Sequence, residues 1–159
     1  MSLSWPRYED PETPYISLYR PVGLFEMELI ANVHHFYSYP PRLPGQPIFY
    51  PVLNIEYATK IARDWNTKDG ASGYAGFVTG FRVPEAALSI WPPKCVGGKE
   101  HMELWVPADQ LPAFNALIAP PIQIYEGYRG PNCDDADMDL LKDDRGEIYS
   151  FARRAQKVA

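Results

Sequence analysis

Cysteine and long apolar runs are both scarce in this sequence. Cys95 and Cys133 are its two cysteines among 159 residues, and neither stands in a CxxC pair. Two isolated thiols build neither a closed zinc site nor a disulfide framework, so we expect free thiols and no bound metal. No apolar run reaches the roughly 18 residues of a membrane helix, and the opening MSLSWPRYEDPETP lacks the features of a signal peptide. We therefore expect a cytoplasmic protein without a membrane partner.

An excess of basic residues is missing as well. The chain has 15 Lys and Arg against 20 Asp and Glu, which gives a formal net charge of −5. Proteins bind nucleic acids largely by displacing counterions with clustered Lys and Arg. The charge balance therefore argues against nucleic acid as a partner.

Tyrosine and proline, in contrast, are abundant, with 11 and 17 copies. Tyrosine combines a large apolar face with a polar end, which suits partly wet grooves, and proline restricts the backbone of long connections. Many of the tyrosines crowd the first third of the chain, where they offer stacking surfaces for a planar ligand. This composition favours a binding cleft bordered by ordered loops.

Composition also divides the chain into three segments. Residues 1–14 carry prolines among charged residues and are expected to run over the surface as an N-terminal arm. Residues 15–128 are expected to form one core. Residues 129–159 form a charged appendage, in which the acidic stretch 134–147 is expected to lie in solvent and 148–158 to form a basic helix. We expect the core to stay folded when residues 131–159 are deleted.

Periodicity within the core predicts an α+β fold. Alternating patterns rich in β-forming residues predict strands over 16–20, 74–83, 102–106 and 122–125. Helical spacing predicts helices over 24–32, over 54–65 with Asn54 as N-cap, and from Pro112 to Ile118. The run 48–53 around Pro51 is interpreted as an edge strand or an extended loop.

Several catalytic motifs are incomplete or missing. The run His101-Met102-Glu103 has the H-x-E spacing of zinc deaminases, but no P-C-x-x-C partner accompanies it. The glycines of 70–80 match neither a dinucleotide nor a Walker pattern, and no G-x-S-x-G elbow exists. These observations argue against a deaminase, a phosphate-loop enzyme and a triad hydrolase.

Two charged residues stand at the ends of predicted strands. Glu103 lies within the apolar run MELWVP, where a carboxylate is costly unless it is exposed, paired or held at a ligand cleft. Arg20 ends the first predicted strand and can place a guanidinium at the opening of the same ligand cleft. An outward-facing position for Glu103 stays open as an alternative. Together the two residues suggest an anionic ligand with sugar hydroxyls.

A resemblance to a known family rests on four runs, LYRPVG, QPIFYPVLNIEYATKIARDWN, GFVTGFRV and GGKEHMELWVPADQLPAFNALI. Over roughly 18–125 these runs are similar to small bacterial proteins labelled ADP-ribosylation/crystallin J1-like. More distantly, the order of elements resembles the ADP-ribosyltransferase fold. This resemblance implies a compact, mostly antiparallel split sheet with flanking helices, and a cleft in the sheet that binds NAD.

The resemblance also implies roles for individual residues. Arg20, in the pair Tyr19-Arg20, would hold the ribose or phosphate side of NAD, and Glu103 would bond the nicotinamide ribose. Tyr50 or Tyr57 would stack on nicotinamide. A carboxylate at that place stabilises the oxocarbenium-like sugar that forms when nicotinamide leaves.

His101 stands two positions before Glu103, where arginine-modifying members of the fold carry a second Glu that guides the acceptor. The resemblance therefore does not imply an arginine acceptor.

Two functions follow from these observations. In the first, the protein binds NAD or an ADP-ribose compound and acts as an ADP-ribosyltransferase or NAD glycohydrolase. In the second, it is a non-catalytic binding module, such as an accessory or immunity-type protein, that uses the same fold to bind a protein partner. The acceptor and the oligomeric state are left open.

Overall fold

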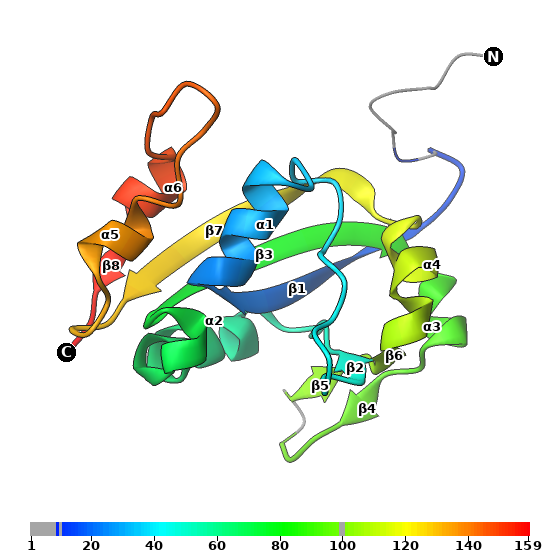
Figure 1. Ribbon diagram of the computed structural model, residues 1–159. Helices are drawn as coiled ribbons and strands as arrows, with labels where there is room; N and C mark the ends of the chain where they lie inside the picture. The colour runs from blue at the N-terminus through cyan, green and yellow to red at the C-terminus, as the bar shows by residue number, and fades with distance from the viewer. Residues whose placement is uncertain (1–8, 10, 99–100) are drawn as a thin grey trace.

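β3 (Ala75–Pro84) is the central strand of the main sheet. In the computed structural model, which describes residues 9, 11–98 and 101–159, β3 pairs antiparallel with β1 (Tyr15–Gly23) and with β7 (Ala119–Arg129) (Figure 1). A short parallel strand, β8 (Gln156–Lys157), continues the sheet beyond β7. The result is a mixed α+β fold with an open sheet in the order β1-β3-β7-β8.

The alternation of side chains along β3 gives the sheet two different faces. Phe77 and Phe81 belong to the larger core, which also contains residues of α1 (Leu24–Asn32). Val78 belongs to a smaller core with residues of α2 (Ile55–Asp64). The two helices therefore cover opposite faces of the sheet, and α1 lies in front of it in Figure 1.

Local interactions explain where α2 begins and how closely it packs. The Asn54 side chain accepts a hydrogen bond from the Tyr57 backbone N–H and caps the helix. Ala58 and Ala62 are fully buried, and a Cβ at Gly76 would collide with the Ala62 carbonyl oxygen. The missing side chain at Gly76 therefore lets the end of α2 lie directly on β3.

Short elements make up the rest of the fold. Four two-residue strands form two antiparallel ribbons, β2 (Ile48–Phe49) with β6 (Val106–Pro107) and β4 (Lys94–Cys95) with β5 (Met102–Glu103). The short helices are η1 (Asn66–Lys68), η2 (Gly70–Ser72), α3 (Ala87–Ile90), η3 (Ala108–Gln110), α4 (Leu111–Asn115), α5 (Asp135–Met138) and α6 (Ser150–Arg153). Within the described ranges, no helix has the length and apolar character needed to cross a membrane.

Most of the elements expected from the sequence are present. The structure confirms the strands expected over 16–20, 74–83 and 122–125 and the helices expected over 24–32 and 54–65. The single strand expected over 102–106 is wrong. Leu104 N–H donates to the Pro51 carbonyl at 2.8 Å, and there the chain leaves its pairing with β4 and begins to pair with β2. The helix expected from Pro112 ends at Asn115, short of Ile118.

The acidic C-terminal stretch packs on the core, so the expectation that 134–147 lies in solvent is wrong. Met138 and Leu141 are buried in the larger core, as are Phe151 and Ala152 further along. Most of the acidic side chains of this stretch stay exposed, which is why composition alone hid the packing. The helix expected over 148–158 is also wrong, because α6 ends at Arg153 and β8 follows it.

The expected segments relate to the structure in different ways. β7 runs through the expected core boundary at residue 128. Of the expected arm 1–14, residues 1–8 and 10 lie outside the described residues. α5, α6 and β8 gather near one end of β7 (Figure 1).

Two adjacent leucines test whether the C-terminal stretch is part of the core. Leu141 is 0% exposed and Leu140 is 40% exposed. We expect Leu141→Ala to lower the free energy of unfolding by about 2–5 kcal/mol, because it leaves a cavity in packed surroundings. Leu140→Ala should change it by less than about 0.5 kcal/mol. Urea unfolding followed by circular dichroism measures the free energy of unfolding of both variants. A change of less than about 0.5 kcal/mol in Leu141→Ala as well would show that the stretch does not belong to the core.

Candidate functional site

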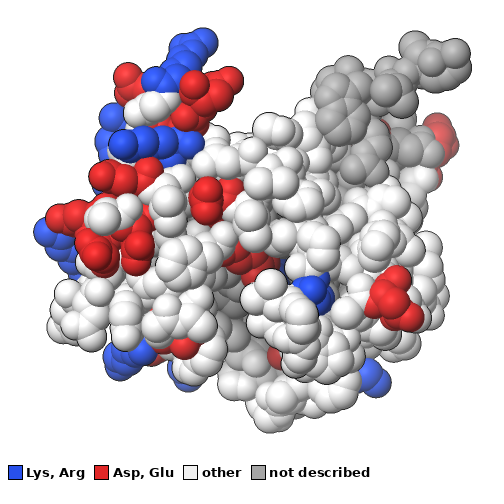
Figure 2. All heavy atoms as spheres, viewed as in Figure 1, with Lys and Arg blue, Asp and Glu red and all other residues white. Residues whose placement is uncertain are grey.

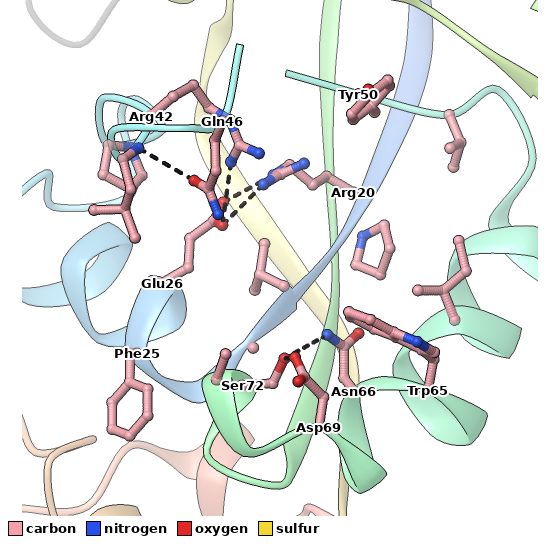
Figure 3. Close-up of a pocket in the computed structure, with 18 of the residues that line it drawn as sticks. Arg20, Phe25, Glu26, Arg42, Gln46, Tyr50, Trp65, Asn66, Asp69 and Ser72 are labelled. Carbon is pink, nitrogen blue, oxygen red and sulfur yellow. Dashed lines mark hydrogen bonds and ion pairs between the residues drawn. The ribbon is translucent and has the colours of Figure 1, made fainter. Parts of the chain in front are cut away.

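A cleft of about 830 Å³ opens beside the end of β1 (Figure 3). Its walls are the end of β1 with the start of α1, the proline-rich loop 40–46, the segment 65–72 after α2, and Tyr50, Val52, Val96, Glu103 and Trp105. Its volume lies within the range of pockets that bind small molecules and cofactors. Figure 2 shows that charged side chains gather over the C-terminal elements, whereas much of the rest of this face is uncharged.

Val52 joins the parts of the chain that carry the two predicted charges. Its N–H and carbonyl exchange hydrogen bonds with Tyr19 at 2.7 and 2.8 Å. On its other side it forms a bridge with Glu103, and the Leu53 N–H donates to the Met102 carbonyl at 3.0 Å. This short ladder places Arg20 and Glu103 at the same cleft.

Arg20 is held in an ion pair at one end of the cleft. Its Nε and Nη2 each donate to a different carboxylate oxygen of Glu26 at 2.8 Å, and its guanidinium carbon lies 4.6 Å from the centre of the Phe49 ring. Arg20 is 8% exposed. Burial lowers the pKa of Arg20, but the charge and hydrogen bonds of Glu26 outweigh burial, so the pKa is raised and the guanidinium stays charged.

A second arginine stands beside this pair. Arg42 Nη1 lies 4.0 Å from Glu26 Oε1, and burial together with the charge of Arg20 lowers the pKa of Arg42. Two cations therefore surround one carboxylate, which leaves this end of the cleft with an excess of positive charge. Such an excess attracts an anionic group.

The backbone under Arg20 is fixed by a buried pair of hydroxyl groups. Thr79 Oγ1 donates to the Arg20 carbonyl at 2.7 Å, and Tyr39 Oη lies 2.6 Å from Thr79 Oγ1. Thr79 and Tyr39 are almost fully buried. Because buried hydroxyl groups are costly to leave unpaired, these two hydrogen bonds resist movement of the Arg20 backbone.

Glu103 is buried, at 9% exposure, and both of its oxygens accept hydrogen bonds. Trp105 Nε1 donates to Oε1 at 2.8 Å, and the Tyr57 hydroxyl donates to Oε2 at 3.2 Å. The His101 ring stacks on Tyr57, with ring centres 4.4 Å apart. Burial and the negative charge of Glu103 raise the pKa of Tyr57. The carboxylate is thus oriented from two sides by aromatic donors.

Exposed aromatic rings border the cleft. Phe25, Tyr50, Trp65 and Trp105 line it, and each is more than a third exposed. Tyr50 and Trp105 contact each other edge to face, with ring centres 6.1 Å apart. Rings held in this way offer stacking surfaces to a planar ligand.

The structure brings some of the predicted site residues together in the cleft, whereas others do not line it. Arg20, Tyr50 and Glu103 line the cleft. Tyr57 and His101 do not line the cleft. The Tyr57 hydroxyl donates to Glu103, and the His101 ring stacks on Tyr57. Tyr19 does not line the cleft, and its ring lies 6.0 Å from that of Tyr125.

The cleft residues that sequence reasoning missed include Glu26, Arg42, Trp65 and Asn66. The pairing of Glu26 with Arg20 depends on α1 starting directly after β1, and this abrupt start was the one signal in the sequence. Arg42 reaches the site through a loop without periodicity. Trp65 and Asn66 follow the end of α2, where they read as helix-terminal and turn residues.

Neither a metal nor a relative helps to define the site. Within the parts of the chain that the structure describes, no group of three or more His, Cys, Asp or Glu side chains is placed so that it could hold a metal ion. Comparisons with protein-family models, with curated proteins and with solved structures found no match. The chemistry of the cleft therefore has to be argued from its own residues.

Replacing Glu103 with Gln tests the contact between the carboxylate and Tyr57. The change removes the charge and keeps the shape, so we expect the pKa of Tyr57 to fall toward its ordinary value, while burial keeps part of the shift. Nuclear magnetic resonance of tyrosine labelled with ¹³C at Cζ measures the titration. Glu56→Gln, an exposed change on α2, serves as the control and should leave Tyr57 nearly unchanged. An identical titration in Glu103→Gln would contradict the contact.

Proposed function

We propose that this protein binds NAD or a related ADP-ribose compound in the cleft and cleaves its bond to nicotinamide, as an ADP-ribosyltransferase or NAD glycohydrolase. The observation that carries the proposal is that Arg20, Tyr50 and Glu103 line one cleft. These residues stand far apart in the sequence and match the roles implied by the resemblance to the ADP-ribosyltransferase fold.

The charges of the cleft are arranged to suit such a ligand. The excess of positive charge at Arg20 and Arg42 fits the two phosphates of a dinucleotide, with Glu26 holding the guanidinium of Arg20 in place. The exposed rings of Tyr50 and Trp105 fit a planar base. Glu103 supplies a carboxylate that is already oriented by Trp105 and Tyr57.

The reaction assigns a clear task to Glu103. The bond between the ribose C1′ and the nicotinamide nitrogen breaks, and its electron pair leaves with nicotinamide. The oxygen of a water molecule, or a nucleophilic atom of an acceptor, then bonds to C1′, and the attacking group releases a proton to solvent. The positive charge that develops on the sugar is stabilised by the nearby carboxylate, which is fixed before the reaction begins.

One observation favours the alternative of a non-catalytic binding module. Both oxygens of Glu103 already accept hydrogen bonds, and both oxygens of Glu26 already hold Arg20. A cleft whose charges are satisfied within the chain can bind a ligand without promoting bond cleavage. Ligand binding with no release of nicotinamide would support this alternative.

Glu103→Gln separates the two functions. We expect the affinity for NAD, measured by calorimetry, to change little, while the rate of nicotinamide release falls by about 10² or more, as when one electrostatic stabiliser is lost. Chromatography of the released nicotinamide measures the rate, and Glu56→Gln is the control that should keep it. If the wild-type protein binds NAD and leaves it intact with every acceptor tried, the enzymatic proposal fails.

Arg42→Gln tests the proposed phosphate end of the cleft. Arg20 and Glu26 keep their hydrogen bonds in this variant, so the result reports the loss of the Arg42 cation. We expect weaker binding of NAD and of ADP-ribose by about tenfold or more, with little change for free nicotinamide, which carries no phosphate. Equal binding of ADP-ribose by the wild-type protein and the variant would rule out this end as the phosphate site.

A further inference from the structure

Asn66 presents a hydrogen-bond acceptor that the described residues leave unused. The residue is 5% exposed and lines the cleft directly after α2. Its Oδ1 is buried and has no hydrogen-bond partner among the described residues. A buried polar atom without a partner is unfavourable, and at a cleft it indicates a place for a ligand or a water molecule.

A chain of hydrogen bonds fixes the direction of the Asn66 amide. Asn66 Nδ2 donates to Ser72 Oγ at 2.9 Å, and Ser72 Oγ donates to Asp69 Oδ2 at 2.7 Å. The Asp69 carboxylate can only accept, so the hydroxyl proton of Ser72 points to it and the Ser72 oxygen must accept from Asn66. The Asn66 oxygen is therefore the end of the amide that faces away from Ser72 and Asp69.

The described residues of the segment 61–72 that line the cleft include an aromatic and an acidic side chain and no Lys or Arg. Figure 3 shows Asn66 and Trp65 together at the end of the cleft opposite Arg42 and Gln46, with Asp69 and Ser72 beside them. Trp65 is 61% exposed and lines the cleft. The Asp69 carboxylate disfavours an anion here, whereas an N–H donor would satisfy the Asn66 oxygen.

We propose that Asn66 and Trp65 form a subsite for a planar heteroaromatic group that carries an NH₂ donor, either an exocyclic amine or a carboxamide. Trp65 stacks on the ring, and Asn66 Oδ1 accepts a hydrogen bond from the NH₂ group. The subsite deepens the proposed function and rests on it, because adenine and nicotinamide are the two planar groups of NAD and both carry NH₂. The phosphates then occupy the end of the cleft with Arg20 and Arg42.

Asn66 Oδ1 is buried in the structure, so a ligand reaches it only when a side chain beside it moves. We infer that Trp65 is this side chain, because it is adjacent in the sequence, lines the same cleft and is 61% exposed, so that few contacts hold it in place. Ligand binding should therefore change the environment of this ring. A fluorescence change that is lost in Trp65→Phe would report the movement.

Matched pairs of ligands test the subsite by calorimetry. Adenosine is compared with inosine, and nicotinamide with 3-acetylpyridine, since each second compound is uncharged and lacks the NH₂ group. We expect the wild-type protein to prefer the NH₂ compound of one pair by about tenfold or more, and that pair identifies the bound ring. Asn66→Leu, which keeps a similar volume without the acceptor, should lose the preference, whereas Asn132→Leu, at an exposed asparagine outside the cleft, should retain it.

The outcomes distinguish this proposal from the proposed function. Equal affinity within both pairs, or no binding of any of the four compounds, overturns the subsite, and the oxygen then takes only water. An unchanged preference in Asn66→Leu overturns it as well. Where Asn66→Leu fails to give a cooperative melt, Trp65→Ala carries the test and should weaken the preferred compound about tenfold or more. Release of nicotinamide from NAD without any preference for NH₂ compounds would leave the proposed function standing alone.

Discussion

The arrangement of the cleft depends on the backbone pairing of Val52. This residue exchanges two hydrogen bonds with Tyr19 on one side and bridges to Glu103 on the other, so it joins the edge of the main sheet to the β4–β5 ribbon. Backbone hydrogen bonds set a strand spacing of about 5 Å, and this spacing fixes how far Arg20 and Glu103 can be apart. The charges of the cleft are therefore positioned by main-chain geometry, and their own contacts only refine the orientation of each side chain.

The ion pair of Arg20 with Glu26 has a second consequence for the cleft. A buried guanidinium without a partner would be strongly destabilising, so Glu26 keeps the positive charge in place before any ligand arrives. The same carboxylate repels an incoming phosphate. Arg42, 4.0 Å from Glu26, offsets that repulsion because it adds a second cation to the same end. Affinity for an anionic ligand then depends on two arginines acting together rather than on Arg20 alone.

The sequence predicted the long elements of the fold better than the site. Alternation along β3 and the apolar stripe of α2 repeat over ten residues each, so the periodic signal was strong, and Asn54 marked the start of the helix. The ribbons of β2, β4, β5 and β6 are two residues long and carry no periodicity, so the split at Leu104 was invisible. The packing of Met138 and Leu141 was hidden for another reason. Met138 stands between two aspartates and Leu141 precedes a lysine, and so few apolar residues in a charged stretch predict a solvated chain. Arg20 and Glu103 could be named from residue type and position, and Tyr50, with Tyr57 as its alternative, through the resemblance. Glu26 and Asn66 enter the cleft only through tertiary contacts.

The hydrogen bonding of the cleft separates what holds its charges from what can select a ligand. Arg20 and Glu103 have hydrogen-bond partners within the chain before binding. A ligand that contacts them therefore adds to existing hydrogen bonds and relieves no unpaired group. Asn66 Oδ1 has no partner among the described residues, so a ligand that donates to it removes an existing cost in the free protein. An analogue without the donor leaves that cost in place, and sites with buried polar groups reject such analogues strongly. In the proposed subsite, discrimination between similar planar rings should therefore come from Asn66, and attraction of an anionic group from Arg20 and Arg42.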